Sequence, residues 1–423
     1  MKRTKESNLI FDRRIFVFTF FSTSIFYLLQ MLSNWWLLSI TGIKGQDRFG
    51  DLKLVLMYFD CYNTVGEDVF TAPTDDPCTG YIYGRQFLYL MSRLGIGEDS
   101  VNILAALLIL SFLVISSAII ALAPSMKKST VLGLLVIISP GCWLLLERTN
   151  LDILIFVLIG LAVFSIYKKF PGIAVLLLVI SAFIKFYTFP LAIITIFFIQ
   201  KLQQKILASV FVALSGTLLL SEIVRIPRLP SSWYVSFGNQ IVAHWWNLLL
   251  SVKKLDWPEA DFLLGSIAGG IFILICSIIC SQLFGESIKS FSVDLEHRLV
   301  KLELVALVYL YTASVFLICY FAGMNYDYRL FYEGISCLIA VKLLPKNSAL
   351  LRFLVLTTLI SLWFSSFFYG MEGIQVIFIQ LVGDVFTGIS ASINALIMLN
   401  LLLLRIRDNK TKHQKLVEYI ANN

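Results

Sequence analysis

Carboxylates are concentrated in segment 41–100, which holds nine acidic and five basic side chains. Asp51 differs from the other acids because it starts an apolar segment, 51–60, that could lie along a membrane surface as a helix. An ionised carboxylate held there could take a proton from a hydroxyl group, a step that typically accelerates a reaction about 10²–10⁴-fold. Asp60, at the other end of the segment, is the second candidate for this base. The alternatives are that Asp51 only favours a helix start and that most of the acids form a solvated loop.

Three cations are candidates for binding an anionic group, and for Lys185 the sequence itself suggests a lipid phosphate. Lys185 interrupts the apolar stretch 171–200, and ionisable residues within membrane segments commonly have a function. Arg329 lies in a polar turn with Asp327, and Arg85 lies in segment 41–100. The alternatives are that Lys185 extends its ammonium group to the membrane surface and that Arg329 only pairs with Asp327.

Segment 233–246 is rich in aromatic residues and also contains Asn239, Gln240 and His244. Tyr and Trp favour the headgroup region of a membrane, so this segment could be a surface anchor. Its three polar side chains are not needed for anchoring, and they could bind a hydroxylated substrate.

Two of the seven cysteines, Cys61 and Cys78, are expected outside the membrane. An oxidising compartment would let them form a disulfide that restrains segment 41–100, although spacing alone does not fix the pairing. The other five fall in apolar segments, where cysteine behaves as a small buried apolar residue. No histidine lies near Cys61 or Cys78 in the sequence, and we expect neither an essential metal nor a cofactor.

The composition predicts that membrane helices position these groups. Hydrophobic residues make up 58% of the chain and charged residues 14%, whereas about a quarter of a soluble domain is charged. The mean hydropathy is +0.83. Uncharged runs such as Ile15–Ile40 and Val101–Met126 reach the roughly 20 residues that cross hydrocarbon as a helix. Because backbone groups in lipid must be hydrogen-bonded internally, we expect an all-α polytopic membrane protein.

The apolar pattern predicts about twelve transmembrane helices in one domain, residues 15–404, with tails at 1–14 and 405–423. The basic residues behind the net charge of +7 lie in both tails and in short loops rather than on one nucleic-acid-binding face. Cytoplasmic loops are enriched in Lys and Arg, so both termini are expected on the cytoplasmic side of the plasma (inner) membrane. Loops 41–100 and 223–261 then face outward. The expected spans are 15–40, which we interpret as retained rather than cleaved, 101–124, 130–146, 151–167, 171–184, 187–200, 206–222, 262–284, 303–322, 330–344, 352–370 and 385–404.

Two features depart from a simple alternation of spans. Segment 223–261 is expected outside although it holds four basic residues, Arg225, Arg228, Lys253 and Lys254. Either these residues bind something anionic or the count is wrong by one span at this point. Several middle spans are also short for a full crossing, and we expect broken or half-depth helices that line a cavity there.

Four short motifs follow one another in the order found in a known family. They are Asp51-Leu with Gly66-Glu-Asp-Val-Phe70, then Thr149-Asn-Leu-Asp152, Lys185-Phe-Tyr-Thr-Phe-Pro190 and Gly238-Asn-Gln-Ile241. Over about residues 15–335, this pattern resembles the GT-C superfold glycosyltransferases that use polyprenyl-phosphate sugars, in particular the family 87 (DUF2029) mannosyltransferase-like membrane proteins. The chain departs from that pattern at Tyr81-Ile-Tyr-Gly-Arg85, where the family often has Tyr-Pro-Pro, and at Phe186, which replaces a proline.

The resemblance implies an inverting sugar transfer on the outer face. A hexose, with mannose as one candidate, would move from a polyprenyl-phosphate donor to a lipid or glycan acceptor. Asp51 would be the general base, and Lys185, Arg329 and Arg85 are then the candidates for binding the donor phosphate. Asn150 and Asp152 are interpreted as capping residues of the span that follows them rather than as catalytic groups.

Two other functions fit the same composition. A secondary transporter would also have about twelve spans and cytoplasmic tails, but the sequence shows no paired halves. The short loop 124–130 also lacks the Gly/Asp/Arg-rich signature of major-facilitator transporters. A polymerase or ligase of lipid-linked polysaccharide has a similar topology, and only the four motifs and the placement of the long loops distinguish it.

Overall fold

The described part of the chain consists of helices joined by short turns. The computed structural model describes residues 11–33, 48–71, 77–81, 83–122, 127–223, 260–321, 327–345, 348–365 and 374–421. Within these ranges every regular element is a helix, so the predicted all-α class is confirmed for them. The α-helices are α1 (Arg13–Leu32), α3 (Gly50–Val65), α4 (Arg85–Arg93), α5 (Val101–Ala121), α6 (Lys127–Ile137), α7 (Pro140–Arg148), α8 (Asp152–Tyr167), α9 (Pro171–Ile184), α10 (Phe189–Ile196), α11 (Leu202–Ile223), α13 (Ala260–Val300), α14 (Leu304–Phe321), α15 (Phe331–Leu343), α16 (Ala349–Phe364) and α17 (Ile374–Ala421).

Five of the described helices are long and apolar enough to cross a membrane. They are α1, α5, α11 and most of α13 and α17. A sixth candidate is the pair α6 and α7, which bends by 47° at its break. The helices α8, α9, α10, α14 and α16 are apolar but shorter than this test requires. The expected twelve crossings therefore stay a prediction, and the short middle helices agree with the expectation of incomplete spans.

The structure corrects the predicted bounds of three spans. Segment 130–146, expected as one helix, is divided between α6 and α7 because Pro140 cannot donate a backbone hydrogen bond and Ser139 is extended, with ψ 154°. Helix α13 continues to Val300, well past the predicted end at residue 284. Helix α17 continues to Ala421, so the tail expected from residue 405 is helical over most of its length.

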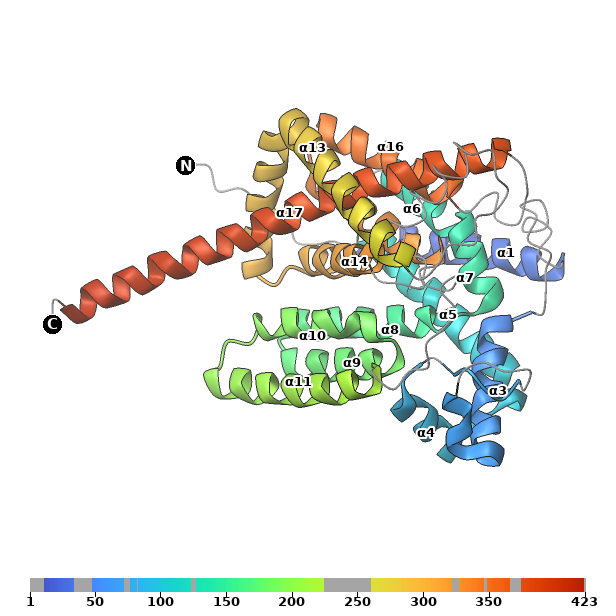
Figure 1. The fold of residues 1–423 in the computed structure, drawn as a ribbon. Helices are drawn as coiled ribbons and strands as arrows, with labels where there is room; N and C mark the ends of the chain where they lie inside the picture. The colour runs from blue at the N-terminus through green and yellow to red at the C-terminus, as the bar shows by residue number, and fades with distance from the viewer. Residues whose placement is uncertain are drawn as a thin grey trace.

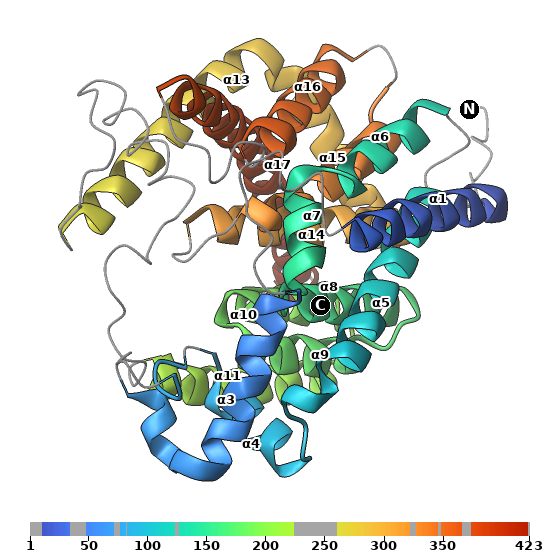
Figure 2. The same cartoon turned by 90° about the vertical axis from the view of Figure 1, so that its right-hand side faces the viewer.

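Two backbone hydrogen bonds show how the ends of the helices are arranged. The Asp12 amide donates to Ala121 O at 3.1 Å, which places the start of α1 beside the end of α5. The Phe49 amide donates to Glu147 O at 2.9 Å, which joins the start of α3 to the end of α7. Figure 1 shows α3 and α4 at one end of the helix bundle, opposite the end to which α17 carries the C-terminus. Helices α8 to α11 pack against one another, and Figure 2 shows them behind α3.

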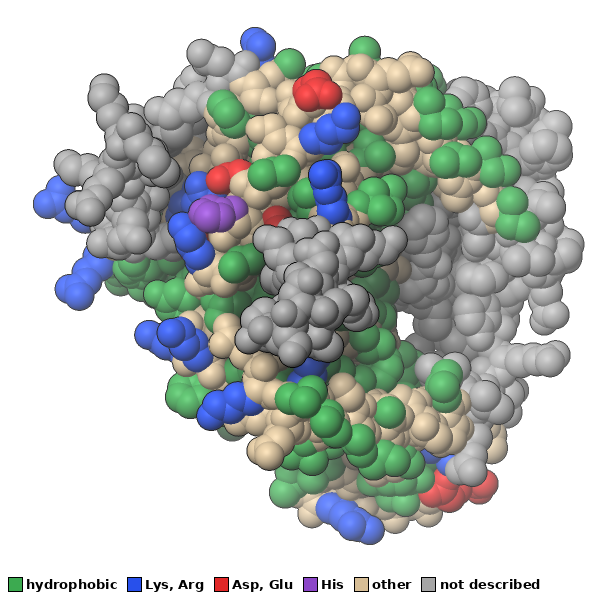
Figure 3. All heavy atoms as spheres, turned by 90° about the vertical axis from the view of Figure 1, so that its left-hand side faces the viewer, with side chains coloured by type: hydrophobic (Ala, Val, Ile, Leu, Met, Phe, Trp, Pro, Cys, Tyr) green, Lys and Arg blue, Asp and Glu red, His purple; other side chains and the backbone are tan. Residues whose placement is uncertain are grey.

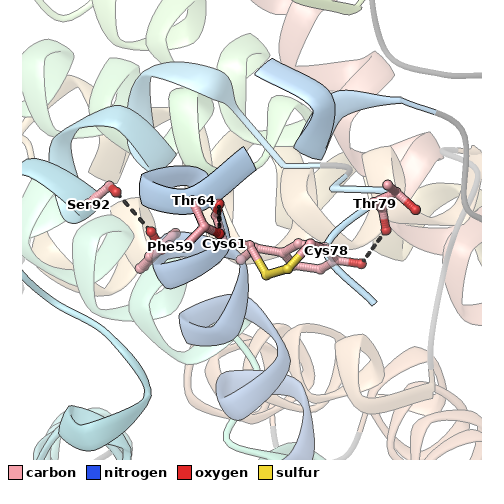
Figure 4. Close-up of a disulfide and its surroundings, with 7 residues drawn as sticks. Phe59, Cys61, Thr64, Cys78, Thr79 and Ser92 are labelled. Atoms are coloured by element: carbon pink, nitrogen blue, oxygen red, sulfur yellow. Dashed lines mark hydrogen bonds between the residues drawn. A yellow bond between two sulfur atoms is a disulfide. The ribbon is translucent and has the colours of Figure 1, made fainter. Parts of the chain in front are cut away.

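The described residues of segment 48–100 form a small folded unit beside the start of α5. Cys61 on α3 and Cys78 form a disulfide across a sequence separation of 17 residues (Figure 4). The Ser92 hydroxyl of α4 donates to Phe59 O at 2.8 Å, and the Tyr58 hydroxyl donates to Thr79 O at 3.0 Å. These contacts hold α3 in place, and α3 carries Asp51 in its first turn.

Replacing both cysteines, Cys61→Ser with Cys78→Ser, is expected to destabilise this unit. A disulfide that closes a loop of about this length contributes roughly 3 kcal/mol by restricting the unfolded chain. Backbone amides of 48–71 and 83–100 should exchange with solvent about two orders of magnitude faster in the double variant. The control is Cys276→Ser, a free cysteine outside the unit. Equal exchange rates in the wild type and the double variant would show that the disulfide does not stabilise this unit.

Candidate active site

Seven polar side chains meet at the end of the helix bundle where α3 begins. We call them the polar cluster: Asp51, Arg148, Asn150, Asp152, Lys185, Tyr187 and Arg329. They come from α3, the end of α7, the turn before α8, the start of α8, the turn after α9, the 3₁₀ helix Phe186–Thr188, and the 3₁₀ helix Asp327–Leu330. Because these segments are distant in sequence, the cluster exists only when the helices are packed.

Asp51 is the most solvent-accessible carboxylate of the cluster, with 21% of its side chain exposed. Its Oδ2 accepts a hydrogen bond from Asn150 Nδ2 at 2.5 Å, and its Oδ1 accepts one from Arg148 Nη1 at 3.3 Å. The position in the first turn of α3 is favourable because backbone amide groups there attract negative charge. The carboxylate is thus held in one orientation while part of its side chain remains exposed.

Asn150 connects the exposed carboxylate to the buried groups behind it. Its Oδ1 accepts from Lys185 Nζ at 2.7 Å and from the Asp152 amide at 3.0 Å. The turn is possible because Thr149 adopts a left-handed conformation, with φ 46°, at the end of α7. Asn150 Oδ1 thus accepts from the first amide of α8, but the capping position is Leu151 and no side-chain cap is formed there, so the interpretation of Asn150 as a capping residue is not confirmed. The same side chain bridges Asp51 and Lys185.

Asp152 is completely buried and accepts contacts from three side chains. Its Oδ1 lies 3.1 Å from Lys185 Nζ and 2.6 Å from the Tyr187 hydroxyl, and its Oδ2 lies 3.1 Å from Arg329 Nε. The interpretation of Asp152 as a capping residue is wrong, because its carboxylate is used for these ion pairs and no side-chain cap is formed at the start of α8. A capping site and a buried ion pair require the same residue type at the same place, so sequence alone could not separate them.

Lys185 and Arg329 are both in the cluster, as the sequence predicted, and only 7% of each side chain is exposed. Each also lies over an aromatic ring. The Arg329 guanidinium carbon is 4.8 Å from the centre of the Tyr187 ring, and Lys185 Nζ is 5.4 Å from that of Tyr83. Burial strengthens cation–aromatic attraction. These rings therefore help to compensate for the loss of water around the two charges.

Asp60 and Arg85 are not in contact with the cluster. Asp60 lies nine residues further along α3, about 14 Å at the rise of a helix, and its Oδ2 accepts from the Glu98 amide at 2.8 Å. Arg85 pairs with Glu67 at 3.2 Å and lies 4.1 Å from the centre of the Phe70 ring. Glu67 also accepts from Tyr89, and burial together with this hydrogen bond raises the pKa of Tyr89 to about 12. Both residues thus help to hold segment 48–100 together.

The remaining predicted groups lie outside the described residues. This applies to Asn239, Gln240 and His244, and to the side chain of Asp327, the expected partner of Arg329.

The structure adds two residues to the cluster, Arg148 and Tyr187, which the sequence analysis missed. Arg148 directly precedes the Thr149-Asn-Leu-Asp152 motif, and this adjacency was the available signal. No group of three or more His, Cys, Asp or Glu side chains in the described ranges is arranged to hold a metal ion.

Comparison with known proteins identifies no relative of this chain. No family model matches it, and neither a curated protein nor a solved structure matches it.

Asp152→Asn is expected to destabilise the folded protein by about 3–5 kcal/mol, because it leaves two buried cations without their charge partner. The free energy of unfolding in detergent would measure this effect. The matched control is Glu98→Gln, which breaks the ion pair with Lys53 at 3.4 Å, where both side chains are 45% exposed. An exposed pair of this kind contributes at most about 1 kcal/mol. Equal effects of the two substitutions would contradict the role assigned to Asp152.

Proposed function

We propose that this chain is a membrane glycosyltransferase that moves a hexose from a polyprenyl-phosphate donor to a lipid or glycan acceptor, with inversion. The observation that carries the proposal is the polar cluster, in which an accessible carboxylate, Asp51, is linked through one asparagine to a buried pair of cations. A base and a phosphate-binding group are the two requirements of this reaction that a protein must supply.

The proposed chemistry is one displacement at the anomeric carbon of the donor sugar. The acceptor hydroxyl oxygen attacks that carbon while its proton passes to the Asp51 carboxylate. The bond between the anomeric carbon and the phosphate oxygen breaks, and the electron pair leaves with polyprenyl phosphate. Asn150 and Arg148 would keep the carboxylate aimed at the acceptor, which is why their contacts with both Asp51 oxygens support the assignment.

The cations would stabilise the phosphate as its negative charge increases. Arg148 is the most accessible of them, with 36% of its side chain exposed, and it would touch the phosphate directly. Lys185 and Arg329 lie behind it and are already paired with Asp152. They would therefore act mainly through the positive potential that they add to the site, which is stronger in buried surroundings than in water.

The proposal places the chain in the plasma membrane with about twelve crossings and both termini in the cytoplasm. The arrangement of charged residues supports one part of it, namely that the end of the bundle opposite the polar cluster faces the cytoplasm. The polar cluster lies at the end of the bundle where α3 begins, and Lys168, Lys169, Lys201 and Lys301 lie in turns at the opposite ends of their helices. Figure 3 shows that opposite face with several Lys and Arg side chains on it. Cytoplasmic surfaces are enriched in these residues, so the cluster would face outward.

Asp51→Asn should reduce sugar transfer about 10²–10⁴-fold, because it keeps the shape of the side chain but removes the base. Transfer of labelled sugar from a polyprenyl-phosphate donor in membranes would measure the loss, and donor binding should be retained. Asp60→Asn is the matched control on the same helix and should leave transfer within a few-fold of the wild type. A larger loss in Asp60→Asn than in Asp51→Asn would transfer the role of base to Asp60.

Lys185→Gln and Arg329→Gln should each weaken transfer about 10–100-fold, because each removes a positive charge near the phosphate, and at an effective dielectric constant of about 20 a unit charge roughly 6–10 Å away is worth about 2–3 kcal/mol. The effect should appear as a higher apparent KM for the donor or as slower turnover. Arg85→Gln removes a cation that the structure pairs with Glu67 instead, so its effect should be much smaller. An Arg85→Gln variant that is as defective as the other two would place the phosphate near α4.

A buried carboxylate favours a second candidate, an ion-coupled secondary transporter. Glu333 on α15 is fully buried, and its Oε2 accepts a hydrogen bond from Ser361 at 2.7 Å. The Ser361 and Thr387 hydroxyl oxygens are 2.6 Å apart, so α15, α16 and α17 share this polar site. Carboxylates within membrane helices often mark ion or proton pathways. Solute uptake into vesicles that is lost in Glu333→Gln but not in Asp51→Asn would favour the transporter.

The products would separate the first proposal from a polymerase or ligase of lipid-linked polysaccharide. A glycosyltransferase of the proposed kind adds one sugar per reaction. A polymerase makes a series of lengths, and a ligase moves a preassembled glycan.

A further inference from the structure

A groove between α9 and α11 lies at the end of the bundle opposite the polar cluster. Its volume is about 510 Å³, and most of the residues that line it are apolar. They include Phe170, Ile173, Leu176, Leu207 and Phe211, and Lys169 lines it as well. A second cavity of about 190 Å³ adjoins it and shares Lys169, Pro171 and Gln204. Pockets that hold small molecules typically enclose about 300–1,000 Å³. The larger cavity is within that range and opens beside a charged mouth.

Two lysines form the charged mouth. Lys169 lines both cavities and Lys201 lines the smaller one. Lys169 has a left-handed backbone, with φ 66°, at a helix end where glycine is the usual residue. The neighbouring Lys168 and Lys205 do not line either cavity. Lys168 lies over the rings of Phe164 and Tyr167, and Lys205 lies over the ring of Phe197. No acidic side chain is among the residues that line the two cavities.

The walls of the groove are apolar and open to the outside of the bundle. Phe170 is 60% exposed and Leu207 is 72% exposed, and Ile173 and Leu176 are also exposed. In a protein surrounded by lipid, such side chains contact acyl chains. Gln200 and Gln204 add hydrogen-bond donors next to the two lysines. Positive charge at the mouth and an apolar groove behind it complement a molecule with an anionic head and a hydrocarbon tail.

We propose that this groove binds one anionic phospholipid of the adjacent leaflet. The lipid phosphate would contact Lys169 and Lys201, and one acyl chain would lie between α9 and α11. Basic pockets between membrane helices on the cytoplasmic side bind anionic lipid headgroups by the same attraction. This site is separate from the polar cluster, because Lys169 precedes α9 and Lys185 follows it, and the 14 residues of α9 span about 21 Å.

Binding of phosphatidylglycerol and of phosphatidylcholine with the same acyl chains to the purified full chain, followed by native mass spectrometry, tests the proposal. Phosphatidylglycerol should be retained preferentially. The double variant Lys169→Gln with Lys201→Gln should bind it about 30-fold more weakly, with phosphatidylcholine unaffected. The matched control, Lys168→Gln with Lys205→Gln, should change the affinity by no more than a few-fold. Equal binding of the two lipids, or an unchanged affinity in the first double variant, overturns the proposal.

A second pair of variants tests the groove independently of charge. Leu176→Trp should fill the groove and reduce phosphatidylglycerol retention, whereas Leu161→Trp, on the exposed face of α8 away from it, should not. Equal retention in the two tryptophan variants would show that the acyl chain does not lie there. If the measured mass is that of a dimer without bound lipid, the groove would be assigned to a second copy of the chain. That result would also overturn the proposal.

Discussion

The carboxylate of Asp152 has no exposed surface and is shared by two cations, Lys185 and Arg329. Arg329 lies 177 residues further along the chain than Asp152, and Lys185 lies beyond the next helix. A buried charge without a partner costs several kcal/mol, so each of these residues depends on the others. The ion pairs therefore fix how the start of α8, the turn after α9 and the turn before α15 meet. Asn150 extends this arrangement to Asp51, which is why a group on α3 is held against the main bundle.

The apolar outer surface of the bundle explains why charged side chains gather at its ends. Many large hydrophobic side chains are exposed on α1, α5, α11 and α13, and apolar surface of this extent is not stable in water. Helices long enough to cross a membrane carry it. Charged groups are then favourable only at helix ends or in buried pairs. The polar cluster occupies one end, and the lysines beside the groove between α9 and α11 occupy the other.

The sequence predicted the parts of the structure that depend on local composition. Helices occur in every predicted span because a long apolar run in lipid must satisfy its own backbone groups. The sequence identifies Asp51, Lys185 and Arg329 as candidate site residues because a charge beside an apolar run loses favourable contact with water, and few residues of the chain are in that position. Asp152 could not be separated from a capping residue, since its role depends on contacts with residues distant in sequence. Arg85 and Asp60 are candidates because of their residue type and their place in the loop. Neither property predicts which partner a side chain contacts after folding.

In the proposed function, the polar cluster transfers sugar from a polyprenyl-phosphate donor. The most direct test uses membranes from cells that carry the gene and from cells that lack it. Both membranes receive a panel of labelled polyprenyl-phosphate sugars, and the lipid and glycan products are then separated. We expect one labelled glycolipid or glycan to appear only when the chain is present, with inverted configuration at the transferred sugar. Identical products in both membranes for every donor, together with solute uptake that depends on the chain, would contradict it.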